Sequence, residues 1–236
     1  MASSKYVIGM DFGTDSVRSI KVDVGNGKEI STFVSYYKRW KEGLYSDAAK
    51  NQFRHHPLDY TESLTEAIVE AIKLAPQETS ENIIGIGIDT TGSTPAPVDR
   101  DGTALALKYG FKDDPDAMFI LWKDHTAVEE SELINKTAKS WGGIDYTKYS
   151  GGVYSSEWFF SKVLHILKTN KKVREAAYSW VELARLDTYN FNRQYKTRGY
   201  KKKKMCCRPK GYVAQIMERS TFPRFFNSSR PSFTRT

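Results

Sequence analysis

The stretch that most constrains the fold lies near the start of the chain, where residues 6–18 read YVIGMDFGTDSVR. A short apolar run ends on Asp11, a polar turn follows, and a second strand-like segment begins at Val17. This pattern predicts a buried strand, a tight turn and a returning strand. An ordinary hairpin with a polar turn is the plainer interpretation, because a bare D-x-G-T pattern is short enough to occur by chance.

The residue types of this turn suit a phosphate group. Gly13 has no side chain, so a ligand can approach the backbone closely, and successive N–H groups there can form an anion-binding nest. Thr14 and Ser16 add hydroxyl donors, and Arg18 adds a positive charge. Asp11, at the strand end, can hold Mg²⁺ through its water shell. The turn is therefore a candidate phosphate site.

Turn and strand signals continue after this hairpin. Residues 25–27 read Gly-Asn-Gly, which is typical of a tight hairpin turn, and residues 29–37 predict a third strand rich in β-branched and aromatic side chains. Residues 38–56 have no clear period and predict a long loop. Within it, His55 and His56 have no third metal ligand nearby in the sequence, so surface polar residues are the favoured interpretation.

A helix and a strand are predicted next. Asp59 can cap the helix with Glu62 three residues on, an apolar face runs through Ala75, and Pro76 ends it. Residues 83–88 then alternate Ile with Gly, which predicts a buried central strand whose glycines suit close packing of a helix.

The loop after that strand, residues 89–96, reads DTTGSTPA. Because ligands of open α/β sheets bind beyond the carboxyl ends of strands, this loop and Asp11 are expected to face one cleft. Ser93, Thr94 and the backbone at Ala96 can hydrogen-bond a polyol. From spacing alone, a rigid turn that contains proline is the favoured interpretation.

A second candidate for ligand contact follows the apolar run at residues 119–122. Trp122 can stack on a sugar face, and Asp124 can accept hydrogen bonds from hydroxyl groups. The alternative makes Trp122 a core residue and Asp124 the cap of the next helix, and both interpretations can hold together. That helix, predicted over residues 127–141, has an acidic face that is interpreted as solvated: Glu129, Glu130 and Glu132.

Two more helices are predicted before residue 181. Residues 155–169 begin with a serine cap and carry a heavily apolar surface, which favours core packing over ligand binding. His165 in this helix is interpreted as structural. The second helix covers residues 172–180, and a strand is expected to begin at Val181.

Several of these segments, in this order, resemble one family. DFGTDSVRSIKVD resembles the first phosphate loop of the FGGY carbohydrate kinases, within the actin-like ATPase superfamily. IGIDTTGSTPAPVDRDG, FILWKDHTA and YSSEWFFSKVLHIL resemble the ribulokinase branch in particular. The resemblance runs from about Lys5 to Ala184, and His125 stands where many members have Arg.

The resemblance implies a fold and an activity. It implies an α/β fold, in which residues 1–184 form most of an actin-like (ribonuclease H-like) N-terminal lobe with a mixed sheet flanked by helices. It implies phosphoryl transfer from ATP, with Mg²⁺, to a ketopentose. The expected substrate is L-ribulose, which would give L-ribulose 5-phosphate, as in L-arabinose catabolism. The catalytic base and the adenosine-binding loops of the family belong to a half that this chain lacks. No catalytic residue is therefore assigned, and the chain alone is expected to be inactive.

The same resemblance assigns site residues. The residues expected at the ATP phosphates are Asp11, Gly13, Thr14, Ser16 and Arg18, with Asp11 also holding Mg²⁺ through water. The residues expected at the sugar are Ser93, Thr94, Ala96, Trp122 and Asp124.

The charge of the chain changes sharply near residue 185. Of the total net charge of +8, residues 186–236 carry +11, from 13 Lys and Arg against two acidic residues, so residues 1–185 carry −3. The resemblance also stops at Arg185. A break of this kind marks a boundary, and residues 185–236 are interpreted as a separate basic tail.

This tail is typical of a wrong reading frame. With one base removed from the Arg185 codon, the following codons become compatible with the sequence that the family has at this point. Two residues are then nearly forced: Met205 before Cys206 gives a cysteine codon, and Met217 before Glu218 gives a tryptophan codon. A single-base insertion is the favoured explanation, and the tail is expected to be disordered because it cannot bury enough apolar surface.

Other classes of protein stay open from the sequence. The chain is also compatible with a non-catalytic sugar- or nucleotide-binding lobe, or with a product that does not fold stably. The run Lys201–Lys204 and the tyrosines of the tail are compatible with a nucleic-acid-binding arm, although the frame interpretation predicts no specific nucleic-acid partner.

The compartment is predicted to be the cytoplasm. No apolar run is long enough to cross a membrane, the start MASSKYVIGM lacks a signal-peptide layout, and the adjacent Cys206 and Cys207 cannot build a disulfide framework. A small sugar is the expected partner, and a homo-oligomer is left open for a full-length form.

Overall fold

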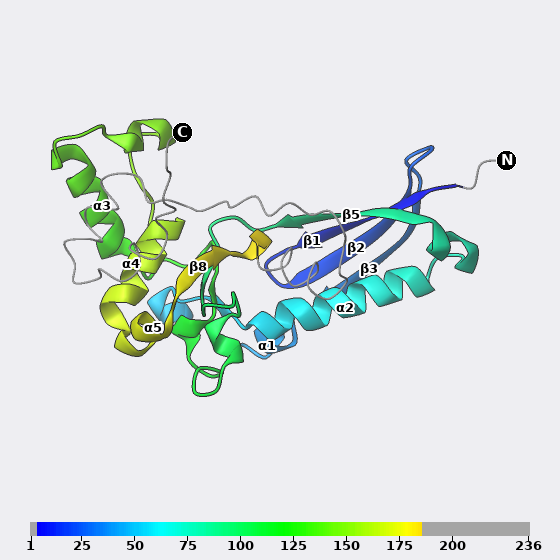
Figure 1. Cartoon of the computed structure of the whole chain (residues 1–236), viewed down its shortest axis with the longest axis horizontal. Coiled ribbons are helices and arrows are strands. Elements are labelled where there is room, and N and C mark those ends of the chain that lie inside the picture. Colours follow the sequence, from blue (N-terminus) through cyan, green and yellow to red (C-terminus); the bar gives the residue numbers. More distant parts are fainter. Residues whose placement is uncertain (1–3, 186–236) are drawn as a thin grey trace, which may run out of the picture.

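The computed structural model of the chain describes residues 4–185 (Figure 1). The strands are β1 (Tyr6–Phe12), β2 (Ser16–Asp23), β3 (Glu29–Tyr36), β4 (Arg54–His55), β5 (Ile83–Thr90), β6 (Pro95–Val98), β7 (Phe119–Ile120) and β8 (Ser179–Glu182). The helices are α1 (Lys38–Lys41), α2 (Pro57–Lys73), α3 (Val128–Ser140), α4 (Phe159–Thr169) and α5 (Lys171–Ala176). The expectations for residues 186–236 lie outside the described residues.

The main sheet has four strands in the order β3-β2-β1-β5. β1 runs antiparallel to β2 and parallel to β5, so the sheet is mixed. The strand, tight turn and returning strand predicted for residues 6–18 are confirmed, and so is the third strand, β3. In the second hairpin, Gly27 has a φ of 72° and its N–H donates to the Asp23 carbonyl at 2.9 Å, as a Gly-Asn-Gly turn requires.

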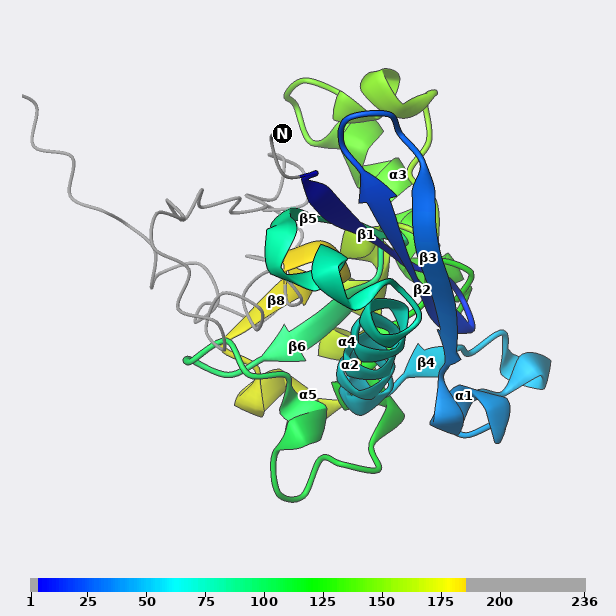
Figure 2. The ribbon, with the colours of Figure 1, turned by 90° about the vertical axis from the view of Figure 1, so that its right-hand side faces the viewer.

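One face of this sheet is covered by α2, which lies along the strands (Figure 1) and is seen nearly end-on beside the sheet in Figure 2. Ile8, Met10 and Phe12 of β1 point to that face and pack with Tyr60 and Ala67 of α2 in one buried cluster. Burial of these side chains stabilises the contact between helix and sheet by about 0.8 kcal/mol for each CH₂ group. Because the sheet contains parallel and antiparallel strands and a helix covers it, the predicted α/β fold class with a mixed sheet is confirmed.

The opposite face of the sheet carries a second set of apolar side chains. Val7 and Val22 are cross-strand partners there, next to Ile20, and all three are half-buried. Among the described residues, α2 is the helix that packs extensively against the sheet, while α3, α4 and α5 lie beyond the strand ends (Figure 1). This face is thus open within residues 4–185.

The prediction of a buried central strand at residues 83–88 is wrong for the described residues. β5 is the last strand of the sheet, and the side chains of Ile84 and Ile86 are 58% and 39% exposed. Ile83 and Ile88 still pack against the core. An Ile/Gly run is typical of a strand covered on all sides, but the described elements cover only part of β5.

The start of α2 also differs from the sequence expectation. His56, not Asp59, is the N-cap: its Nδ1 accepts from the Leu58 N–H at 3.1 Å, and Pro57 occupies the first helical position. Asp59 is buried instead and accepts hydrogen bonds from Arg39. The helix ends at Lys73, just before the predicted stop.

The interpretation of His55 and His56 as surface residues is wrong. Both are buried, and β4 places His55 between the rings of Tyr37, Trp40 and Tyr60, with its Nδ1 2.8 Å from the Tyr60 hydroxyl oxygen. Burial, with the nearby charge of Lys123, lowers the pKa of His55 to about 3. The expected long loop therefore contains α1 and an interior strand.

The later helices form a second region around α3, α4 and α5. α3 packs on α4 through Ile134, Ala138, Leu164 and Leu167. α4 confirms the predicted apolar helix, although its N-cap, Trp158, makes no capping side-chain bond. α5 ends at Ala176, four residues before the predicted end, because Ser179–Glu182 pairs with β6 as β8.

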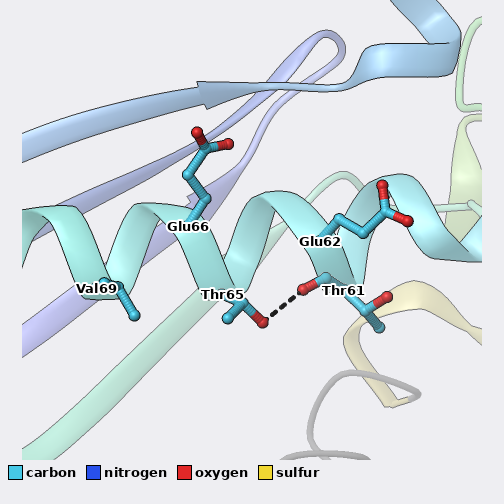
Figure 3. A pocket seen from close by; sticks show the side chains of 5 residues that line it. All are labelled: Thr61, Glu62, Thr65, Glu66 and Val69. Atoms are coloured by element: carbon cyan, nitrogen blue, oxygen red, sulfur yellow. Dashed lines mark hydrogen bonds between the residues drawn. The ribbon is translucent and has the colours of Figure 1, made fainter.

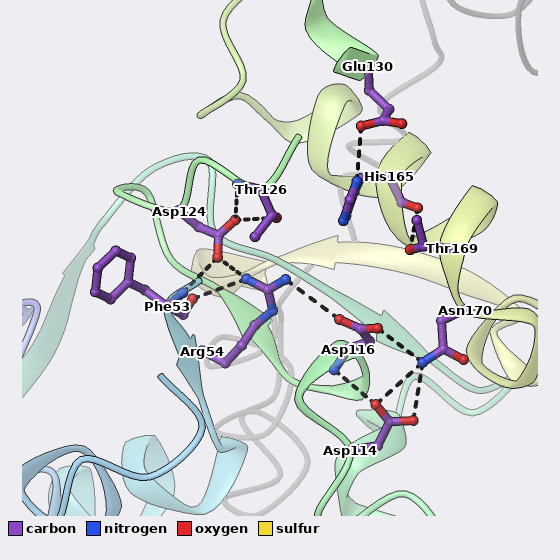
Figure 4. Close-up of polar contacts among 10 residues, drawn as sticks. All are labelled: Phe53, Arg54, Asp114, Asp116, Asp124, Thr126, Glu130, His165, Thr169 and Asn170. Atoms are coloured by element: carbon purple, nitrogen blue, oxygen red, sulfur yellow. Dashed lines mark hydrogen bonds and ion pairs between the residues drawn. The ribbon is translucent and has the colours of Figure 1, made fainter. Parts of the chain in front are cut away.

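Glu130 is buried rather than solvated. Its carboxylate accepts from His165 Nδ1 at 3.0 Å and from Lys168 Nζ at 2.6 Å, which joins α3 to α4 (Figure 4 shows the His165 contact). Burial raises the pKa of Glu130, but the hydrogen bonds from His165 and Lys168 outweigh it and hold the pKa at about 2. The structural role predicted for His165 agrees with this contact. Within residues 4–185, no helix is both long and apolar enough to cross a membrane.

We expect Glu130→Gln to lower the free energy of unfolding by about 1–3 kcal/mol, because two hydrogen bonds to a buried charge are lost. Urea denaturation at neutral pH measures this, with the exposed neighbour changed in Glu129→Gln as the matched control. The pKa is lowered on folding, so the contribution is present above the ordinary pKa of 4.5 and is lost as the pH falls toward 2. Equal midpoints for both variants at pH 7 would contradict the assignment.

Candidate functional site

The turn between β1 and β2 is held by its own backbone and by a buried ring. The Gly13 N–H donates to the Ser16 carbonyl at 2.9 Å, and the Ser16 hydroxyl donates to the Asp15 carboxylate at 2.8 Å. Behind the turn, the Tyr37 N–H donates to the Asp15 carbonyl at 2.9 Å and its hydroxyl to the Gly13 carbonyl at 3.3 Å. Tyr37 was missed from the sequence because it lies 24 residues from Gly13, between β3 and α1.

Gly13 is not required by the packing of the chain itself. Its φ lies outside the left-handed region, and a Cβ added there would meet the Ser16 carbonyl oxygen at 3.5 Å, an ordinary contact. Packing within the described residues therefore does not explain why this position is a glycine. A turn without a side chain at Gly13, beside the hydroxyls of Thr14 and Ser16, would allow a ligand to approach the backbone closely, and the phosphate site stays a prediction.

Asp11 is exposed at the carboxyl end of β1 between two charged neighbours. Arg18 is its cross-strand partner on β2, and Asp89 is its partner on β5. Two neighbouring carboxylates are hard oxygen ligands that suit Mg²⁺, which keeps several waters. Residues 4–185 contain no group of three or more metal-binding side chains, so water and a ligand's own oxygens would complete the coordination.

The loop after β5 is fixed to β8. The Thr94 N–H donates to Glu182 Oε2 at 2.8 Å, and the Leu183 N–H donates to the Thr94 carbonyl at 3.2 Å. Thr94 is buried, with its hydroxyl 3.1 Å from that of Thr91, and Ala96 is buried in β6. Ser93, half-buried with a φ of 55°, is the more accessible of the three predicted sugar contacts.

Trp122 joins the two candidate sites. Its side chain is 43% exposed, and its indole Nε1–H donates to the Thr14 hydroxyl at 3.1 Å, across 108 residues of sequence. The interpretation of Trp122 as a core residue therefore does not fit the structure. The residue predicted to stack on the sugar lies directly beside the residue predicted to bind phosphate.

Asp124 is fully buried, and both of its carboxylate oxygens are occupied by the chain (Figure 4). Oδ2 accepts from the Phe53 N–H at 2.7 Å and from the Arg54 guanidinium, and Oδ1 accepts from the Thr126 N–H and hydroxyl at 3.1 and 2.6 Å. Burial lowers the pKa of Arg54 to about 10, against the opposing charge of Asp116. The alternative that Asp124 caps the next helix is wrong, because α3 begins after Ala127 and has no side-chain cap. Asp124 instead anchors the segment that carries Trp122 to Phe53 and Arg54.

A shallow depression lies on the outer surface of α2 (Figure 3). Its lining residues all come from that one helix: Thr61, Glu62, Thr65, Glu66 and Val69. Glu62 pairs with Arg39, Glu66 accepts from Ser35 at 2.6 Å, and Thr65 donates to the Thr61 carbonyl. Since its polar groups already bind the chain and no predicted site residue lines it, we do not assign it a ligand.

No protein-family profile matches the chain. Among curated proteins, it is 51% identical over 179 residues to a ribulokinase of Vibrio parahaemolyticus, covering 76% of this chain and 32% of that protein. It is 36% identical over 170 residues to a ribulokinase of Halalkalibacterium halodurans, covering 70% and 30%. The chain thus spans about a third of the length of these relatives.

Solved structures agree on the fold. A xyloylose kinase from Brucella ovis superposes with a TM-score of 0.59 at 15% identity, covering 75% of this chain and 32% of that one. At this identity the likeness concerns the fold alone, which is that of sugar kinases with the actin-like ATPase fold.

We expect Asp124→Asn to lower the free energy of unfolding by about 3–5 kcal/mol, because the buried guanidinium of Arg54 then keeps only its longer ion pair with Asp116, at 3.6 Å. Trp122→Phe, at an exposed position in the same segment, should cost less than about 1 kcal/mol. Chemical denaturation of both variants measures the difference. If Asp124→Asn is as stable as the parent chain, the carboxylate does not stabilise the fold and the structural assignment is wrong.

Proposed function

The chain is a partial homologue of the ribulokinases, and from that premise we propose that residues 4–184 are the phosphate- and sugar-binding part of an ATP-dependent pentulose kinase. The proposed substrate is L-ribulose, phosphorylated at its terminal hydroxyl to L-ribulose 5-phosphate. The whole activity belongs to a protein about three times the length of the matched segment.

The observation that supports this proposal most directly is the hydrogen bond between Trp122 and Thr14. Phosphoryl transfer needs the acceptor hydroxyl and the terminal phosphate side by side, since positioning supplies most of the catalysis. Trp122 presents a half-exposed ring on which a sugar face can stack. The loop at Ser93, held by Glu182 through Thr94, would contact the sugar hydroxyls.

The turn residues would bind the phosphates of ATP. The absence of a side chain at Gly13 would let the phosphates approach the backbone of the turn, with the hydroxyls of Thr14 and Ser16 and the charge of Arg18 as further donors. Asp11, with Asp89 beside it, would hold Mg²⁺ through water. When bound, Mg²⁺ supplies neutralisation of the phosphate charge. We assign the catalytic base to none of residues 4–185.

We expect the 236-residue chain to bind L-ribulose without turning it over. Its melting temperature should rise with L-ribulose, because a ligand that binds only the folded state stabilises it. Trp122→Ala should remove this response, and Gly13→Ala, at the phosphate turn, should keep it. A coupled assay for ADP should give no signal above a no-protein control. No sugar-dependent shift in the folded chain would contradict the function, and turnover that is lost in Asp11→Ala would contradict the predicted inactivity.

We further propose that residues after Arg185 are read in the wrong frame. The change of charge at this point and the two nearly forced codons, at Met205 and Met217, support the proposal. The open face of the sheet and the exposed Ile84 and Ile86 of β5 are consistent with a lobe that needs further chain to cover them. Cytoplasmic location, the lack of a specific nucleic-acid partner and oligomerisation of a full-length form stay predictions.

We expect deletion of one base in the Arg185 codon to restore a long open frame whose product phosphorylates L-ribulose. Apolar residues would then continue the segment after β8 in place of Arg185, Asp187 and Asn190. In the restored enzyme, Asp11→Ala should lower kcat by weakening phosphate positioning. Sequencing and a spectrophotometric kinase assay test this. A stop codon within a few residues of the repair would show that the tail has another origin.

A further inference from the structure

Lys162 is a buried cation that the proposed function leaves unused. It lies on α4, it is 0% exposed, and its Nζ donates to two backbone carbonyls: Ser93 at 2.7 Å and Leu121 at 2.6 Å. Taking an ammonium group out of water costs several kcal/mol. An apolar side chain would pack here without that cost, so the presence of a lysine that bonds two carbonyls calls for an explanation.

The two carbonyls belong to the two halves of the candidate sugar site. Ser93 precedes Thr94 in the loop after β5, and Leu121 precedes Trp122 in the segment after β7. The two residues are 28 positions apart in the sequence, and one ammonium group binds both. Lys162 therefore links the backbone of Ser93 to the residue that precedes Trp122.

Charged groups from several elements face Lys162. Glu182 on β8 and Glu157 before α4 attract its charge, and Arg54 on β4 repels it. Glu182 also accepts the Thr94 N–H, so the Ser93–Thr94 loop is held from two sides. Burial lowers the pKa of Lys162 to about 7, with Glu182 opposing the shift. The charge on this contact consequently changes within the physiological pH range.

We propose that Lys162 is a positioning residue that fixes the spacing between the Ser93–Thr94 loop and Trp122 across the sugar site. The proposal rests on the proposed function for the identity of the ligand, and on the two carbonyl contacts for the geometry. Lys162 touches no ligand itself: it acts through the backbone of Ser93 and Leu121.

The test compares Lys162→Met with Lys168→Met in the full ¹⁵N-labelled chain. Both variants lose a lysine of α4, but Lys168 bonds Glu130 and touches neither loop. The readout is the indole N–H resonance of Trp122, one of five tryptophans, identified by its loss in Trp122→Phe. Lys162→Met should shift this resonance and raise the dissociation constant for L-ribulose about tenfold or more, whereas Lys168→Met should change neither.

A pH titration gives a second readout that a purely structural role would not move. In a His125→Asn background, which removes the imidazole that pairs with Glu157, the Trp122 resonance should titrate with a midpoint near the Lys162 pKa of about 7. The inflection should be absent from Lys162→Met. If Lys162→Met does not fold, this titration of the Lys162-containing chain decides alone.

The outcomes separate the two proposals. A parent chain that does not bind L-ribulose overturns the proposed function and leaves the resonance comparison intact. A Trp122 resonance that is unchanged in folded Lys162→Met, or that shows no inflection near pH 7, overturns the positioning role. Equal effects of Lys162→Met and Lys168→Met reduce Lys162 to a residue that stabilises α4, which also overturns it.

Discussion

The parallel pairing of β1 with β5 is the contact on which the site depends. Because parallel strands end at the same edge of a sheet, the turn after β1 and the loop after β5 emerge side by side, with Asp11 next to Asp89. Each of the two loops is also held by contacts with other elements. Tyr37 supports the first from behind, Glu182 holds the second, and Trp122 reaches the first through Thr14.

Much of this was predictable where the cause is local in the sequence. The hairpin of β1 and β2, the third strand, α2 and the apolar α4 follow from periodicity and turn residues within a few positions of each other. Prediction from the sequence fails where a polar side chain has its partner far away in the chain. His55, buried among aromatic rings, and Glu130, bonded 35 residues ahead to His165, both resemble surface residues when only their neighbours are considered.

The region around the candidate sugar site is built from buried polar groups. Arg54 binds Asp124, and Lys162 binds two carbonyls, all without exposure to solvent. A buried ion pair such as Arg54–Asp124 adds little net stability compared with apolar packing, but the loss of one partner of a buried charge is costly. These buried contacts restrict the backbone to one arrangement, which is what a site that must hold two reactants needs. For Asp124 and Lys162, the sequence places both residues in recognisable motifs but does not indicate that their side chains are buried and bind other parts of the chain.

The uncovered side of β5 has a consequence for how this chain behaves in concentrated solution. Residues 83–88 contain no charge and no proline, and within residues 4–185 no strand pairs with the outer edge of β5. Such an edge presents free N–H and C=O groups to any other extended segment, and charged or bent edges normally prevent this. The strand that brings the site together is therefore also the place where separate molecules would add strand to strand, so self-association should begin at β5 and be weakened by a lysine introduced at Ile84 or Ile86.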